Sequence, residues 1–124
     1  MGAMMEIQRI VTNSYSVQNT WVELLKLYED AGSLYQDMLH NPQNTLIDLD
    51  QLIALAQKME AISSKMPIPP SAPDFRKDFE GFLSSLIQMK DDYLSGVAFN
   101  FNSVEFFMKK AGTDLNYIFH DIMK

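Results

Sequence analysis

The two histidines are the first candidates for chemistry, because imidazole ligates metals and exchanges protons near neutral pH. His40 ends an Asp-x-x-His sequence that begins at Asp37, and His120 is followed by Asp121. Di-iron sites in four-helix bundles need two Glu-x-x-His sequences and two further carboxylates, and the sequence contains no Glu-x-x-His. We therefore interpret both histidines as residues near helix ends, and we expect no metal and no cofactor.

Other arrangements that support catalysis are also missing from the sequence. The chain has no cysteine, which excludes disulfides, thiolate metal ligands and thiol nucleophiles. It contains neither a Gly-x-Ser-x-Gly elbow nor a glycine-rich phosphate loop. Asp91 and Asp92 are adjacent, and neighbouring residues on a helix point in different directions, so we interpret them as a solvated face. We expect that the protein is not an enzyme.

Apolar residues recur every three or four positions through four long stretches, which is the spacing of one helix face. The pattern predicts helices at 6–40, 46–65, 74–96 and 103–124. The expected buried faces are Ile7, Ile10, Val17, Trp21, Leu24, Tyr28, Ala31, Tyr35 and Met38; Leu49, Leu52, Ala56, Met59 and Met66; Phe75, Phe79, Phe82, Leu86, Met89 and Tyr93; and Val104, Phe107, Ala111, Leu115, Ile118 and Ile122.

Proline and glycine mark the expected helix ends. Asn41-Pro42 ends the first stretch, because the residue before proline is pushed out of the α region. The proline-rich segment 66–73 cannot be helix interior, and we interpret it as a rigid, extended spacer. Asn102 or Ser103 is expected to cap the last helix.

Two features leave an alternative open within the first stretch. Thr20 and Glu23 match a capping box, so a separate helix could begin at Thr20. Gly32-Ser33 could kink the helix. We favour one continuous helix.

These stretches predict an all-α fold, a four-helix bundle with up-down-up-down antiparallel topology and a long first helix. Residues 1–4 resemble a remnant of cloning, and residues 5–124 form the expected single domain. At about 1.5 Å per residue the helix at 6–40 would be about 50 Å long, against about 36 Å for 74–96. Part of the first helix is therefore expected to lack a neighbour within the bundle.

The charge distribution bears on the class of partner. The formal net charge is −6, and the largest basic clusters are the pairs Arg76-Lys77 and Lys109-Lys110. Nucleic-acid binding needs a concentrated basic surface, so we expect no nucleic-acid partner. No apolar run approaches the roughly 18 residues of a membrane-spanning helix. The compartment stays open, with the cytoplasm favoured, and a leader ahead of Met5 could have been removed.

We expect a non-enzymatic helical module for protein–protein interaction, such as an adaptor, a chaperone-like protein or a regulatory subunit. A homodimer is expected to cover the apolar residues of the first helix, namely Ile7, Ile10, Val11 and Tyr15. Phe99 and Phe101 lie in a connection, where they either close the end of the bundle as a lid or stand exposed as a docking point.

An alternative function belongs to a different class. The aromatic spacing of 74–96 could line an apolar pocket for a small molecule between this helix and the helix at 103–124. A cavity lined by Phe79, Phe82 and Met89 would favour this sensor, whereas a filled core would favour the interaction module.

Overall fold

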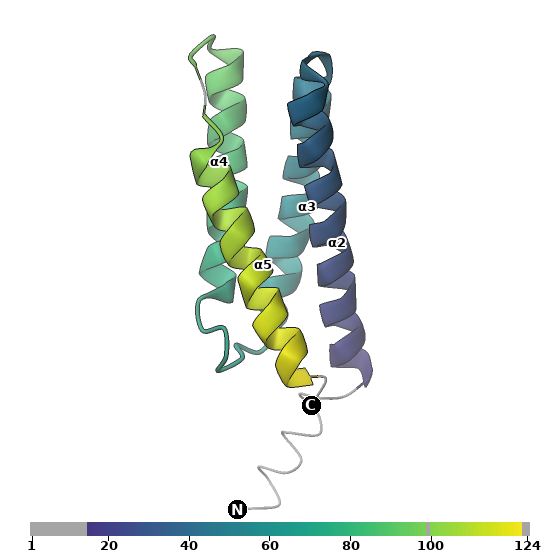
Figure 1. The fold of residues 1–124 in the computed structure, drawn as a ribbon. Helices are drawn as coiled ribbons and strands as arrows, with labels where there is room; N and C mark the ends of the chain where they lie inside the picture. Colours follow the sequence, from purple (N-terminus) through teal and green to yellow (C-terminus); the bar gives the residue numbers. More distant parts are fainter. Residues whose placement is uncertain (1–14, 99, 123–124) are drawn as a thin grey trace, which may run out of the picture.

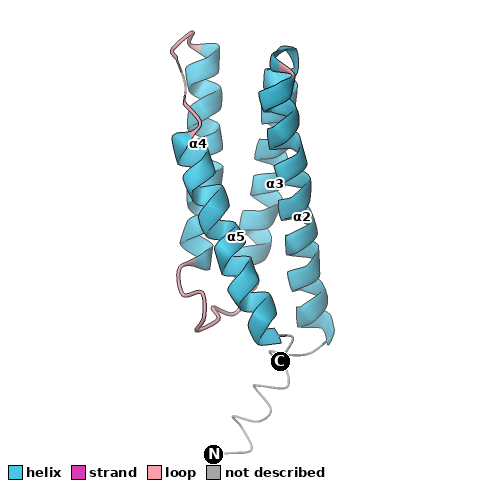
Figure 2. Ribbon diagram, in the orientation of Figure 1, coloured by secondary structure: helices cyan, strands magenta, loops and turns pink. Residues whose placement is uncertain are grey.

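The computed structural model describes residues 15–98 and 100–122, with side chains from Gln18 onward. Four α-helices follow one another: α2 (Tyr15–His40), α3 (Thr45–Lys65), α4 (Phe75–Leu94) and α5 (Asn102–Ile122), with a 3-10 turn, η1 (Pro42–Asn44), after α2. Successive helices run in opposite directions, as Figure 1 shows. Loops and the η1 turn connect them, and the described residues contain no strand (Figure 2). The prediction of an all-α, antiparallel four-helix bundle is confirmed.

The first helix is continuous over its described length. α2 runs without interruption through Thr20 and Gly32, so the alternative of a separate helix beginning at Thr20 is wrong. It ends at His40, where the Asn41-Pro42 pair predicted an end. The part of the predicted helix at 6–14 lies outside the described residues.

The turn between α2 and α3 is short because side chains and backbone close it together. The Asn41 amide N–H donates to the carbonyl oxygen of Asp37 at 2.8 Å. The Thr45 hydroxyl donates to the carbonyl oxygen of Pro42 at 2.6 Å. These bonds satisfy backbone groups that a helix end leaves unpaired, and they hold α2 and α3 side by side.

Glycine ends α4 two residues before the predicted limit of 96. Gly96 has a φ of 72°, which is the left-handed conformation that glycine adopts without strain. The Val97 N–H donates to Asp92 O at 3.0 Å and the Gly96 N–H donates to Tyr93 O at 3.3 Å. This pair of bonds is a Schellman motif, which stops the helix.

The start of α5 differs from the predicted one. We predicted that Asn102 or Ser103 caps this helix. Instead, the side-chain Oδ1 of Asn100 accepts a hydrogen bond from the Asn102 N–H at 3.1 Å. Asn102 is already the first residue of the helix, and Phe101 takes the N-cap position, because its carbonyl oxygen accepts a hydrogen bond from the Glu105 N–H at 2.8 Å.

The proline-rich link lies against the end of the bundle. Met66 and Ala72 are buried in the core. The Arg76 guanidinium donates from Nε to Ser63 O at 3.1 Å and from a terminal nitrogen to Met66 O. Arg76 thus ties the end of α3 to the start of α4, so the link turns against the bundle where we had expected an extended spacer.

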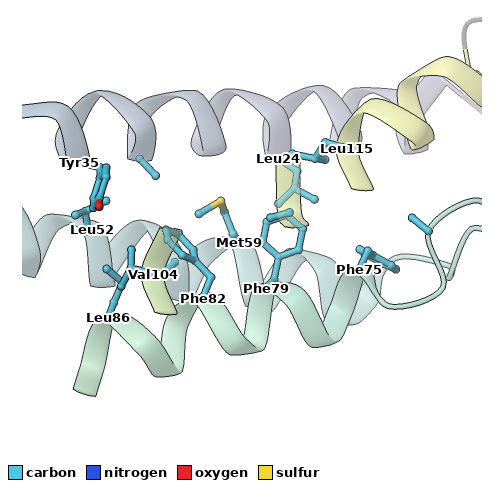
Figure 3. Packing of buried hydrophobic residues seen from close by; sticks show 14 of the residues in the cluster. Leu24, Tyr35, Leu52, Met59, Phe75, Phe79, Phe82, Leu86, Val104 and Leu115 are labelled. Carbon is cyan, nitrogen blue, oxygen red and sulfur yellow. The ribbon is translucent and has the colours of Figure 1, made fainter. Parts of the chain in front are cut away.

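Phenylalanines of α4 fill the centre of the bundle. Phe79 and Phe82 point from α4 into the space between the helices, toward Met59 of α3 and Leu24 of α2 (Figure 3). Nearly all the described residues of the predicted faces are buried or packed against this cluster. The fully or almost fully buried set includes Trp21, Leu24, Phe79, Phe82, Leu86 and Ile118.

Tyr93 is the exception on the predicted face of α4. Its side chain is 39% exposed, although its spacing continues the row of buried residues. Tyr93 lies in the last turn of α4, and α5 begins well below that turn (Figure 1). The row of buried residues on α4 therefore ends at Met89, and spacing alone could not show this.

Substitution of Phe82 by alanine tests the packing of the core. Because Phe82 is 1% exposed, we expect Phe82→Ala to lower the free energy of unfolding by about 3–5 kcal/mol. Urea denaturation at equilibrium measures the loss. Ile87→Ala on the exposed side of the same helix is the control and should change stability by less than about 1 kcal/mol. A loss below about 1 kcal/mol for Phe82→Ala would contradict the assigned register.

Candidate functional site

The two histidines lie at opposite poles of the bundle. His40 ends α2, and His120 lies in the last turn of α5, close to the other pole (Figure 1). His40 Nδ1 is 2.7 Å from the carbonyl oxygen of Gln36, a contact within its own helix end. Within the described ranges, no group of three His, Asp or Glu residues is placed to hold a metal ion.

The adjacent acids Asp91 and Asp92 do not form a reactive pair. Asp91 is exposed, and Asp92 Oδ1 accepts a hydrogen bond from Gln88 Nε2 at 3.0 Å along the surface of α4. Their arrangement is that of a solvated helix face.

Most of the residues predicted to bind a partner lie outside the described part of the chain. This applies to Ile7, Ile10, Val11 and Phe99, and also to the side chain of Tyr15. Phe101 is described and half-buried against the core. Its ring meets that of Tyr35 edge-on, with centroids 5.9 Å apart and planes at 79°. Phe101 therefore takes the position of a lid.

A cavity of about 450 Å³ lies between α4 and α5, where the alternative function placed its pocket. Small and polar residues of α4 form much of its wall, among them Gly81, Ser84 and Ser85. Met89 contributes to the lining, but Phe79 and Phe82 are buried in the core instead. The aromatic row thus fills the bundle and does not form an apolar pocket at this place.

The interface between α2 and α5 is the most open one in the bundle. The other neighbouring helices pack closely, whereas α2 and α5 touch at few points. Figure 1 shows α5 starting well below the upper end of α2 and approaching α2 only farther down. A groove of about 530 Å³ lies between them. It is lined by Tyr28, Tyr35, Gln36, Leu39, Asn102, Glu105, Phe106, Met108 and Lys109.

Tyr28 joins the two helices across the floor of the groove. Its hydroxyl donates to the carbonyl oxygen of Met108 at 2.8 Å. Burial raises the pKa of Tyr28 above its ordinary value, so the hydroxyl stays protonated and remains a donor. The contact requires glycine at 112, because a Cβ there would lie 2.4 Å from the Tyr28 oxygen.

Tyr35 makes the second link, nearer the end of the bundle. Its hydroxyl donates to Glu105 Oε1 at 2.6 Å. Burial raises the Tyr35 pKa, and the hydrogen bond and negative charge of Glu105 raise it further. Tyr35 therefore stays neutral, and its bond to a carboxylate is of the charge-assisted, stronger kind.

The mouth of the groove is apolar although it faces solvent. Leu39 is 39% exposed and Phe106 is 56% exposed. Lys110 Nζ lies 5.4 Å from the centroid of the Phe106 ring, which places a charge beside the aromatic face. An apolar trough between two helices with charged residues on its rim suits the apolar face of another helix.

Sequence reasoning identified the tyrosines as core residues but missed their bridging role. A tyrosine on a buried helix face needs a hydrogen-bond partner for its hydroxyl, and this requirement was the available signal. Phe106 lies off the apolar face of its helix, which marks it as exposed. No feature of the sequence predicted the groove itself, because the groove depends on where α5 begins.

Comparison with known protein families, with curated proteins and with solved structures finds no match to this chain. The groove must therefore be interpreted from its own geometry. Among the described helices, none combines the length and the apolar character that crossing a bilayer requires.

Alanine at position 112 tests the tyrosine bridge. In the native chain, Gly112→Ala should lower the free energy of unfolding by roughly 1 kcal/mol, because the added Cβ displaces the Tyr28 hydroxyl from Met108 O. In a Tyr28→Ala chain, the same change should raise stability by about 0.5–1 kcal/mol, since alanine favours helix more than glycine. Chemical denaturation of the four proteins measures this reversal of sign.

Gly32→Ala is the matched control, because a Cβ at 32 meets no atom within 4 Å. It should stabilise both backgrounds by about 0.5–1 kcal/mol. Equal effects of Gly112→Ala in the two backgrounds would show that Tyr28 does not depend on glycine there.

Proposed function

We propose that this protein is a non-enzymatic helical interaction module that pairs with a second copy of itself. In the proposed homodimer, the segment with Ile7, Ile10 and Val11 from one chain occupies the α2–α5 groove of the other. The exposure of Leu39 and Phe106 at the mouth of the α2–α5 groove is the observation that carries the proposal.

The spacing of the apolar residues supports this occupant. Ile7, Ile10 and Val11 stand at positions i, i+3 and i+4, which is the anchor pattern of a helix that binds in a groove. Glu6 directly precedes Ile7 and Arg9 directly precedes Ile10, and the lining of the groove includes Glu105 and Lys109. Each surface thus offers one acid and one base, so opposite charges can meet on both sides.

The length of the chain favours a second copy over the same chain. Along α2, Tyr28 lies about 20 Å and Leu39 about 36 Å beyond Tyr15, at 1.5 Å per residue. Ile10 precedes Tyr15 by five residues and reaches at most about 18 Å even when fully extended. Even Ile7, eight residues before Tyr15, reaches at most about 29 Å. The segment of one chain therefore stops short of Leu39 at the mouth of its own groove, whereas an antiparallel partner brings its segment to the opposite pole.

Sedimentation equilibrium over a range of concentrations tests the pairing. We expect a dimer for the native chain, and at least about tenfold weaker association for Ile10→Lys and for Leu39→Lys. Ile47→Lys is the matched control, because Ile47 is 60% exposed near the same pole but does not line the groove. It should leave association unchanged.

Mixing the two weakened variants makes the test specific. A chain with Leu39→Lys still carries an intact segment, and a chain with Ile10→Lys still carries an intact groove, so the mixture should form heterodimers with one native contact. A native chain that stays monomeric at all concentrations would overturn the homodimer. If both variants dimerise as strongly as the native chain, the groove is not the contact between the two copies.

A further inference from the structure

Two pairs of aspartates connect consecutive helices, and one member of each pair is buried in the bundle. Asp48 of α3 lies beside Asp37 of α2, and Asp114 of α5 lies beside Asp78 of α4, each close enough for the two carboxyl groups to share a proton. Asp48 is 5% exposed and Asp78 is 3% exposed. Two carboxylates can only accept hydrogen bonds, so each pair needs a proton between its members.

Unsatisfied oxygens mark the place of these protons. Among the described residues, Oδ2 of Asp48, of Asp78 and of Asp114 has no donor within hydrogen-bonding distance. A buried carboxylate oxygen without a donor is costly. A proton shared within the pair removes this cost, because one carboxyl then donates to the other.

The charges around Asp114 come from both helices that meet there. Lys110 of α5 has its Nζ 3.8 Å from Asp78 Oδ1, and it offsets the one negative charge that the protonated pair retains. Asp74, just before α4, adds further negative charge. Burial first, and then Asp78 through its hydrogen bond and its charge, raise the pKa of Asp114 to about 7.

In the pair between α2 and α3, too, one carboxyl group has a raised pKa. Asn41 Nδ2 donates to Asp37 Oδ1 at 2.7 Å, and Asn44 Nδ2 lies 3.3 Å from Asp37 Oδ2. The hydrogen bond from Asp48 and these two amides lower the pKa of Asp37, and His40 lowers it slightly further. The same bond, followed by burial, raises the pKa of Asp48 to about 6.

We propose that Asp78 and Asp114 form a proton-binding latch that holds α5 against α4. The ligand is a single proton, bound between two carboxyl groups on different helices. When it dissociates, two negative charges face each other across the interface and repel the helices. The nearby ammonium group of Lys110 cannot balance both.

Loss of the proton shared by Asp78 and Asp114 should loosen α5 more than the other helices. α5 packs closely against α4 but touches α2 at few points, which include the hydrogen bonds of Tyr28 and Tyr35. Loss of the latch therefore weakens the main interface of α5. The Asp37–Asp48 pair lies beside a short turn, which keeps α2 and α3 together when that pair ionises.

The direction of the pH effect follows from the raised pKa values. A carboxyl group with a pKa of about 7 in the folded chain and 3.8 ordinarily binds its proton more tightly when folded. Its stabilisation is complete below about pH 4 and is lost as the pH rises through 7. The protein should therefore become less stable as the pH rises from about 5 to 7, because in this range the folded chain holds protons that the unfolded chain has already released, and the loss should level off above pH 7.

The experiment combines urea denaturation across this pH range with a local measurement on α5. We expect the native midpoint to fall as the pH rises. Asp114→Asn should retain a higher midpoint at pH 8, because the amide donates to Asp78 at every pH. In a chain with both Asp114→Asn and Asp48→Asn, the urea midpoint should hardly decrease as the pH rises. Asp30→Asn removes the same charge from an exposed site on α2 and should leave the fall unchanged.

Hydrogen exchange, corrected for its intrinsic pH dependence, should show α5 amides opening more at pH 8 than at pH 5 in the native chain only. The carboxyl carbon of Asp114, followed by NMR in the native chain, should titrate near 7. An NMR titration midpoint of Asp114 near pH 4 would overturn the latch. So would an Asp114→Asn chain whose stability falls with rising pH as much as that of the native chain. So would recovery of stability at pH 8 with millimolar Mg²⁺ or Ca²⁺, since the pair would then be a cation site.

Discussion

The row of phenylalanines on α4 is the interaction on which the rest of the bundle depends. Phe75, Phe79 and Phe82 are at most 1% exposed and contribute the largest fully buried side chains. Trp21 of α2 meets the ring of Phe75 edge-on, with centroids 5.5 Å apart. Burial of aromatic rings removes a large apolar area from water, so the other helices take the positions that cover this row.

The same row explains why the fold was largely predictable. Apolar side chains at three- and four-residue spacing determine which face of a helix is buried, and the sequence displays that spacing directly. Asn41-Pro42 and the prolines of 66–73 mark the ends of helices through local sterics, which also need no tertiary information. The helices and most of the core could therefore be derived from residue types and spacing.

The groove and the aspartate pairs depend on how helices are placed against one another. Asp78 lies on α4 between Phe75 and Phe79, and nothing in its spacing reveals its partner on α5. The exposure of Tyr93 and the opening beside Leu39 both follow from the low starting point of α5. That point is set by the Schellman motif at Gly96 and the hydrogen bond from the Asn102 N–H to Asn100, whose combined geometry residue spacing does not reveal.

The order of packing has a consequence for the kinetics of folding. Each close interface joins helices that are consecutive in the chain, α2 with α3, α3 with α4 and α4 with α5. Contacts of this kind are near in sequence, so little loop entropy is lost before they form, and bundles built in this way fold in microseconds to milliseconds. Helices can be added one at a time to a growing hairpin, and α5, which has one strong neighbour, adds the few contacts between the ends of the chain, those of Tyr28 and Tyr35, last.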